Sequence, residues 1–150
     1  VPEKREEITT EGGLDVINNS ELLNKTIKGL NHSGIPVSLF IDPIENQLIA
    51  SKDIGAKYIE LHTGTYAEAL GKNKEFELSK IIKATEIGLG LGLQINAGHG
   101  LTYQNVEPIA RINGIDELNI GHTIISRSIA VGLKEAVREM KDLIINPRKR

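Results

Sequence analysis

Three of the four histidines in this 150-residue sequence stand where chemistry could take place, each at or just past a short apolar run. His62 lies in IELHTG, His99 in INAGHG and His122 in NIGHT. A histidine can give or take a proton near neutral pH. The repeated position predicts a functional site that contains His99 and His122, whereas for His62 a structural role stays open. His32 stands near a predicted helix end, where the helix dipole alone accounts for it.

Glu60 is the carboxylate that accompanies this pattern, two residues before His62. Buried beside a histidine, it would either be held ionised by a partner or have a raised pKa. Either state suits proton transfer or the stabilisation of a cationic intermediate. The alternative is a structural acid bonded to a neighbouring strand. Asn96, Asn119 and Glu117 could likewise form a hydrogen-bond layer with no chemical role.

Glycines next to two of the histidines indicate a phosphate site. AGHGLT places Gly100 after a histidine, and IGHT places Gly121 directly before His122 and a long predicted helix. A glycine lets the backbone approach a ligand closely, and a helix N-terminus offers free N–H groups. The pattern predicts phosphate binding at Gly100, Gly121 and His122, with Thr123 or Ser126 able to help. Tight turns between strand and helix are the alternative reading of the same glycines.

The front segment, PEKREEITTEGGLD, reads as a loop that could contact a ligand or an anion. A mobile charged loop is the alternative. The residues that suit ligand contact are Lys4, Arg5, Thr9, Thr10, Gly12 and Gly13.

Short apolar runs alternate with amphipathic segments along the rest of the chain. The predicted strands are residues 37–41, 58–61, 93–96 and 117–120. The predicted helices are residues 21–31 with Ser20 as N-cap, 46–53, 75–88, 106–111 and 123–144. Strands that alternate with helices imply parallel pairing through right-handed crossovers, which makes this an α/β chain.

The strand pattern favours a barrel over an open sheet. Ile59 and Leu61 alternate with Glu60 and His62, whereas strands covered by helices on both faces are near-continuously apolar. A barrel explains the alternation, because one face meets helices and the other points into the interior. Four strands cannot close a barrel. We therefore expect residues 1–150 to be the C-terminal portion of one (β/α)8 barrel, strands five to eight, with the missing strands before Val1.

Composition narrows the function classes. The formal net charge is only −2, which gives no overall electrostatic case for nucleic acid or an anionic membrane. No apolar stretch approaches the roughly 18 residues typical of a membrane span. The sequence contains no cysteine, which excludes a disulfide framework, thiol catalysis and thiolate metal sites. A cytoplasmic location is the default expectation for a chain without a targeting segment.

Five stretches together carry a resemblance to a known family: VPEKREEITTEGGLDV, VSLFID, IELHTGTYA, INAGHGLTYQNV and ELNIGHTIISRSIAVGLKEAV. In this order, over residues 1–143, the chain resembles the pyridoxine 5'-phosphate synthase family. The resemblance implies a (β/α)8 barrel that condenses 3-amino-2-oxopropyl phosphate with 1-deoxy-D-xylulose 5-phosphate in vitamin B6 biosynthesis. The products would be pyridoxine 5'-phosphate, inorganic phosphate and water. It also implies no metal, no organic cofactor, phosphorylated small molecules as partners, and a homo-octamer.

The same resemblance implies roles for individual residues. By motif match these are His99 as proton donor, Gly100 in substrate contact, Gly121 and His122 at a phosphate, Glu60 stabilising a transition state, and Thr9 in ligand contact.

The family's N-terminal motifs, which supply further catalytic and phosphate-binding residues, have no counterpart in this sequence. We therefore expect the 150 residues alone to be inactive. Two alternatives stay open: another phosphate-binding barrel enzyme, such as an isomerase or an aldolase, and a phosphate-binding half-barrel without catalysis. A Schiff-base aldolase would need a lysine at a strand end, and none of the four predicted strands supplies one.

Overall fold

The computed structural model describes Val1 and residues 12–146, and strands alternate with helices through that part of the chain. The strands are β1 (Ser38–Ile41), β2 (Tyr58–His62), β3 (Gln94–Gly98) and β4 (Ile115–Asn119). The helices are α1 (Ser20–His32), α2 (Glu45–Asp53), α3 (Gly64–Glu68), α4 (Lys72–Gly90), α5 (Val106–Ala110), α6 (His122–Val131) and α7 (Leu133–Ile145).

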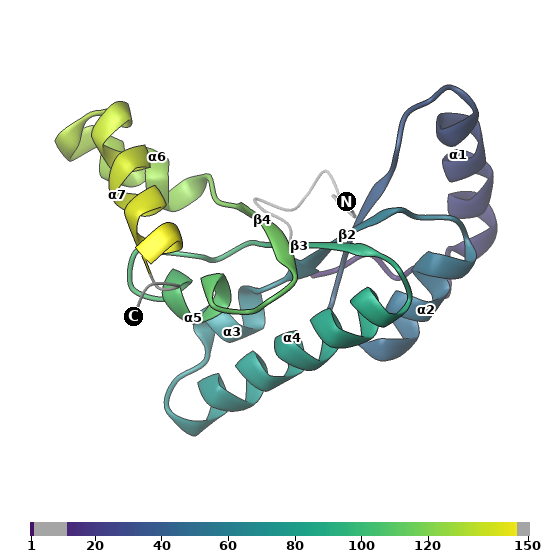
Figure 1. The fold of residues 1–150 in the computed structure, drawn as a ribbon, viewed down its shortest axis with the longest axis horizontal. Coiled ribbons are helices and arrows are strands. Elements are labelled where there is room, and N and C mark those ends of the chain that lie inside the picture. Colours follow the sequence, from purple (N-terminus) through teal and green to yellow (C-terminus); the bar gives the residue numbers. More distant parts are fainter. Residues whose placement is uncertain (2–11, 147–150) are drawn as a thin grey trace.

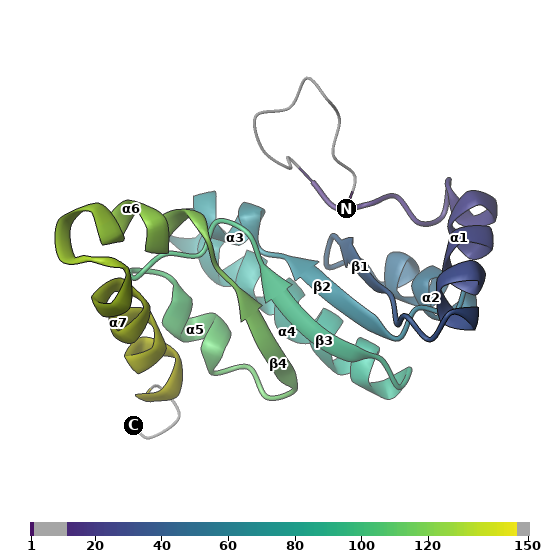
Figure 2. The same cartoon turned by 90° about the horizontal axis from the view of Figure 1, so that it is seen from above.

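The four strands form one parallel sheet in the order β1-β2-β3-β4. Each crossover therefore connects a strand to its next neighbour, always in the same direction across the sheet. In a doubly wound sheet the strand order instead reverses at one point. Helices α2 and α4 pack against one face of this sheet (Figures 1 and 2). Sequential parallel strands with helices on one side form an arc of a (β/α) barrel, so the predicted α/β fold class is confirmed.

Strand register sorts the side chains into two faces, as the alternating pattern predicts. Phe40, Glu60, Asn96 and Glu117 pair across the four strands and share the face away from α2 and α4. A register shift between Ile95 and the next residue marks an irregularity in the pairing of β3 with β4. The row is therefore polar from β2 to β4, and on β1 it ends in the aromatic ring of Phe40.

The opposite face carries the hydrophobic core. Ile59, Leu61 and Ile95 are fully buried there, and Leu48 of α2 and Ile81 of α4 belong to the same cluster. Burial of an aliphatic side chain of this size contributes about 1.5–3 kcal/mol to folding. This core fixes the sheet on its helices and so fixes which residues face the other way.

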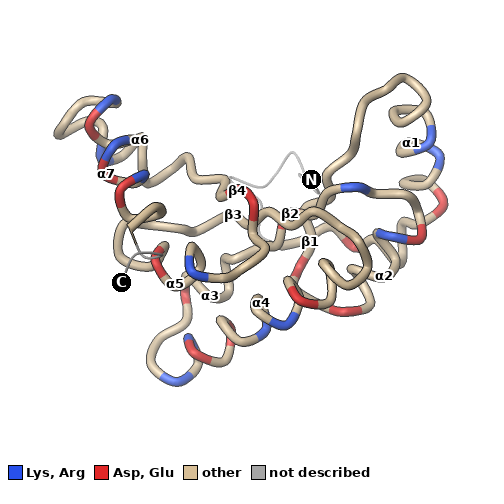
Figure 3. Tube along the Cα trace, viewed as in Figure 1, with Lys and Arg blue, Asp and Glu red and all other residues tan. Residues whose placement is uncertain are grey.

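Charged side chains lie along the outer helices. Figure 3 shows acidic and basic residues interspersed there, without one face of a single sign. Among the described residues, no helix has the length and apolar character needed to cross a membrane.

Two helical details differ from the prediction. Ser20 is the first residue of α1 and not its N-cap; Asn19 holds that position, without a side-chain capping bond. Helix α3 was not expected, because five residues are too few to show an apolar period.

The predicted helix over residues 123–144 is in fact two helices that meet at Gly132. This residue has φ 83° and ψ 151°, a conformation open almost only to glycine. The break turns α7 relative to α6, so that Met140 is buried while Ile129 is 87% exposed. A single helix over residues 123–144 would instead place Ile129 and Met140 on one apolar face.

This break gives a stability prediction from a matched pair of glycine variants. We expect Gly132→Ala to lower the free energy of unfolding by about 1–3 kcal/mol, because alanine disfavours the backbone angles of this residue. Gly29→Ala should instead raise it by up to about 1 kcal/mol, since Gly29 lies within α1 and has open space around it. Urea unfolding of both variants checks this; equal effects would contradict it.

Candidate active site

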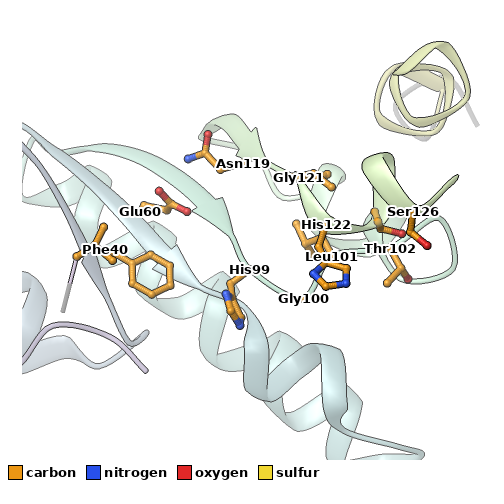
Figure 4. Close-up of a pocket in the computed structure, with 13 residues that line it drawn as sticks. Phe40, Glu60, His99, Gly100, Leu101, Thr102, Asn119, Gly121, His122 and Ser126 are labelled. Carbon is orange, nitrogen blue, oxygen red and sulfur yellow. The ribbon is translucent and has the colours of Figure 1, made fainter. Parts of the chain in front are cut away.

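A cavity of about 550 Å³ lies at the carboxyl ends of β2, β3 and β4. It brings together five of the six residues that the sequence singled out: Glu60, His99, Gly100, Gly121 and His122. Figure 4 shows Glu60 and His99 toward one end of this cavity and His122 toward the other. Glu60 and His99 are 39 positions apart in the sequence and His99 and His122 are 23 apart, and they line one cavity because parallel strands end at one edge of the sheet.

The sixth residue, Thr9, lies outside the described residues, together with Lys4, Arg5 and Thr10. Thr123 and Ser126, which the sequence suggested as helpers for a phosphate, do line the cavity. Sequence reasoning did not name other lining residues as ligand contacts: Phe40, Leu101, Thr102 and Asn119.

The Glu60 carboxylate lies over the neighbouring strand at Gly98. A Cβ on Gly98 would come within 2.3 Å of Glu60 Oε1 and 3.0 Å of Asn119, so an added side chain would displace the carboxylate from this position. Burial raises the pKa of the Glu60 carboxyl, and a hydrogen bond with Asn119 opposes part of that rise. The first glycine of AGHG therefore permits the observed position of the Glu60 carboxylate.

His99 has a strained backbone. Its φ is 79°, and among the described residues it is the only non-glycine with a positive φ. Left-handed conformations are uncommon for non-glycine residues and concentrate at functional sites. Thr63 holds the turn in place: its N–H donates to the Gly98 carbonyl at 2.9 Å, and its hydroxyl lies within bonding distance of the carbonyls of Gly98 and His99.

Two rings surround the His99 imidazole. The ring centroids of His62 and Phe40 lie 5.0 Å and 6.3 Å from that of His99. Burial lowers the pKa of His99, the neighbouring His62 lowers it further, and Glu68 opposes the change. Burial thus moves the pKa values of His99 and Glu60 toward each other, because it disfavours the charged form of both groups.

The structure places His62 beside this cavity and not in its lining. Its Nδ1 lies 2.8 Å from Oδ1 of Asp42, which follows β1. Both residues line a second cavity of about 540 Å³, between β1, β2, α2 and α4. Gly13 of the front segment donates its backbone N–H to the same Asp42 oxygen at 3.2 Å.

At the other end of the first cavity, α6 begins at His122 directly after Gly121. The first N–H groups of a helix have no partner within the helix and carry its positive dipole end. A Cβ on Gly121 would meet nothing within 4 Å, so no neighbouring group requires the glycine. The space beside it belongs to the cavity, and His122 and Ser126 are exposed there.

Sequence reasoning missed Asp42, Thr63 and Phe40. Asp42 carried a usable signal, because it is an acid directly after a predicted strand, in FIDP. Phe40 had none, since VSLFI is continuously apolar and shows no alternation. Among residues 12–146, no group of three histidine, aspartate or glutamate side chains is placed to hold a metal ion.

Sequential parallel strands, helices on one face and titratable side chains at the strand carboxyl ends define a chain of the (β/α)-barrel class. A family model described as "Pyridoxal phosphate biosynthesis protein PdxJ" matches residues 1–146, and the chain belongs to this family.

Curated relatives carry a consistent name. The chain is 60% identical over 149 residues to pyridoxine 5'-phosphate synthase of Prochlorococcus marinus (strain MIT 9313). The aligned region covers 99% of this chain and 61% of the relative. It is 58% identical over 149 residues to the synthase of Synechococcus sp. (strain WH7803), and here the aligned region covers 99% of this chain and 60% of the relative. The chain thus spans about three-fifths of the length of these relatives.

The raised pKa of Glu60 gives a pH prediction. A carboxyl with a raised pKa contributes stability that is complete below its ordinary pKa of 4.5 and lost as pH rises through the folded value. Glu60→Gln removes this loss. We therefore expect the free energy of unfolding of the variant, relative to wild type, to increase as pH rises from below 4.5 to neutral. Urea unfolding across this range measures it, with Glu86→Gln on the exposed face of α4 as control. A difference that is constant with pH would contradict the prediction.

Proposed function

We propose that this chain supplies part of the active site of a pyridoxine 5'-phosphate synthase. The enzyme would condense 3-amino-2-oxopropyl phosphate with 1-deoxy-D-xylulose 5-phosphate to give pyridoxine 5'-phosphate, inorganic phosphate and water. Membership of the family and the name of its relatives support this. The observation that carries the proposal is the single cavity that contains Glu60, His99, Gly100, Gly121 and His122. Its volume of about 550 Å³ is in the range that holds a small metabolite.

In this proposal the Glu60 and His99 end of the cavity handles protons. A condensation through a Schiff base, with eliminations and ring closure, needs several proton transfers. His99 would act as proton donor, because its lowered pKa makes the protonated ring a readier acid. Glu60, turned toward the same space, would stabilise positive charge that develops in the transition state.

The opposite end would bind a phosphate group. The start of α6 offers unpaired N–H groups, Gly121 leaves the backbone open to close approach, and Ser126 adds a hydroxyl. His122 would contact the phosphate oxygens, and Gly100 and Thr9 would contact substrate. Loops after consecutive strands are the usual place for a phosphate site in barrels of this class.

A homo-octamer in the cytoplasm belongs to the same proposal, by resemblance to the family. Exposed apolar side chains on α6 and α7 support contact with protein beyond the described residues. They include Ile125, Ile129 and Leu133, which are 58%, 87% and 56% exposed.

A phosphate-binding half-barrel without catalysis is the second candidate. The observation that favours it is the open four-stranded sheet of the described residues, which does not close into a barrel. An isomerase or an aldolase is less well supported, because neither the family nor the named relatives point to either reaction.

Steady-state kinetics separate these candidates. With the chain in its natural polypeptide, His99→Gln should lower kcat by about 10²–10⁴-fold, the usual contribution of a proton-transferring side chain. His122→Gln should mainly raise KM, because it removes a phosphate contact. His32→Gln, at the exposed end of α1, is the control and should behave as wild type. Substrate binding without any product from wild type would favour the non-catalytic candidate.

A further inference from the structure

His62 is a buried titratable side chain to which the proposed function gives no role. Its ring is 6% exposed, and its Nδ1 pairs with Asp42 at 2.8 Å. Its Nε2 is also buried and has no hydrogen-bond partner among the described residues. Most buried polar atoms are hydrogen-bonded, so an unpartnered ring nitrogen beside an active-site cavity requires an explanation.

We propose that Asp42 and His62 are a positioning pair for His99: the carboxylate orients the His62 ring, and that ring holds the imidazole of His99 at the cavity. The inference rests on the proposed function, in which His99 donates a proton. His62 and Asp42 are positioning residues, since neither lines the cavity that contains His99.

The hydrogen-bond geometry assigns the state of the His62 ring. A carboxylate can only accept, so Nδ1 of His62 carries the proton that it donates to Asp42. Asp42 stays ionised, because the hydrogen bond from His62 lowers its pKa and the Gly13 N–H adds to that effect. The unpartnered Nε2 lies beside Gly64, next to the His99 ring.

Gly64 leaves the room in which the two imidazoles approach each other. A Cβ on Gly64 would lie 2.4 Å from His62 Nε2 and 3.2 Å from His99 Cδ2. The ring centroids are 5.0 Å apart at an interplanar angle of 58°, and Phe40 packs against both rings. The strained His99 backbone, fixed by Thr63, and the packed ring together leave this side chain little freedom.

The contact also has an electrostatic consequence. A proton on His62 disfavours a second proton on His99, and His62 accordingly contributes to the lowered pKa of His99. The Asp42 charge stands on the far side of His62. Other charged or titratable groups line the two cavities beside these rings or act on His99: Glu60 on β2, Glu68 on α3, His122 on α6, Glu45 on α2, and Glu77, Lys80 and Lys83 on α4.

Three variants test the pair: His62→Gln, Asp42→Asn and Gly64→Ala. We expect each to lower kcat roughly tenfold to a hundredfold with little change in KM, because a misplaced proton donor slows the chemical step. His62→Gln should also raise the pKa of His99. The decline of kcat at high pH, where His99 loses its proton, should then move to higher pH. Asp42→Asn and Gly64→Ala keep the test open if His62→Gln does not fold.

The pKa of His99 can be followed without any activity. In protein labelled with ¹³C-histidine, the His99 signal is the one lost in His99→Gln, and its titration is compared between wild type, His62→Gln and the control His32→Gln. An upward shift in His62→Gln alone supports the pair, even if wild type makes no product and the proposed function fails. An unshifted His99 titration, with kcat reduced by the same factor at every pH, would mean a merely structural role for His62 and would overturn the proposal.

Discussion

The parallel pairing of β2 with β3 is the constraint on which the rest of the site depends. Its register sets Glu60 opposite Asn96 and His62 opposite Gly98. The pairing continues beyond the strands, because the Thr63 N–H donates to the Gly98 carbonyl. A shift by one residue would turn Glu60 and His62 toward the apolar face, since successive side chains of a strand point to opposite sides.

Glycine stands on both sides of His99, and the pairing of β2 with β3 accounts for one of the two. Gly98 is small because Glu60 crosses over it from the neighbouring strand, whereas Gly100 has φ 73° and lies close to Ala67 of α3. Two glycines in similar sequence positions therefore have different structural reasons. One makes room for a carboxylate, and the other makes a turn that only glycine accommodates easily.

The sequence predicted the alternation of strands and helices and the two faces of the strands whose residues alternate, and five of the residues that it singled out line one cavity. These succeeded because apolar alternation and position at a strand end are local properties of the chain. It did not predict the Gly132 break, since a single glycine inside an amphipathic period is often tolerated. Nor did it predict Asp42 as the partner of His62, because that contact joins two strands at a register that no local pattern specifies.

Glu60 and His99 together show why the site is built at a half-buried edge. Burial disfavours charge on either group, which raises the pKa of the carboxyl and lowers that of the imidazole. Full exposure would leave both groups near their ordinary pKa values, and full burial would hold both neutral. The strand ends give an intermediate environment, in which small contributions from Asn119, His62 and Glu68 still change the balance between protonated and unprotonated forms. Neighbouring side chains, and not burial alone, therefore tune the pKa values of the two groups.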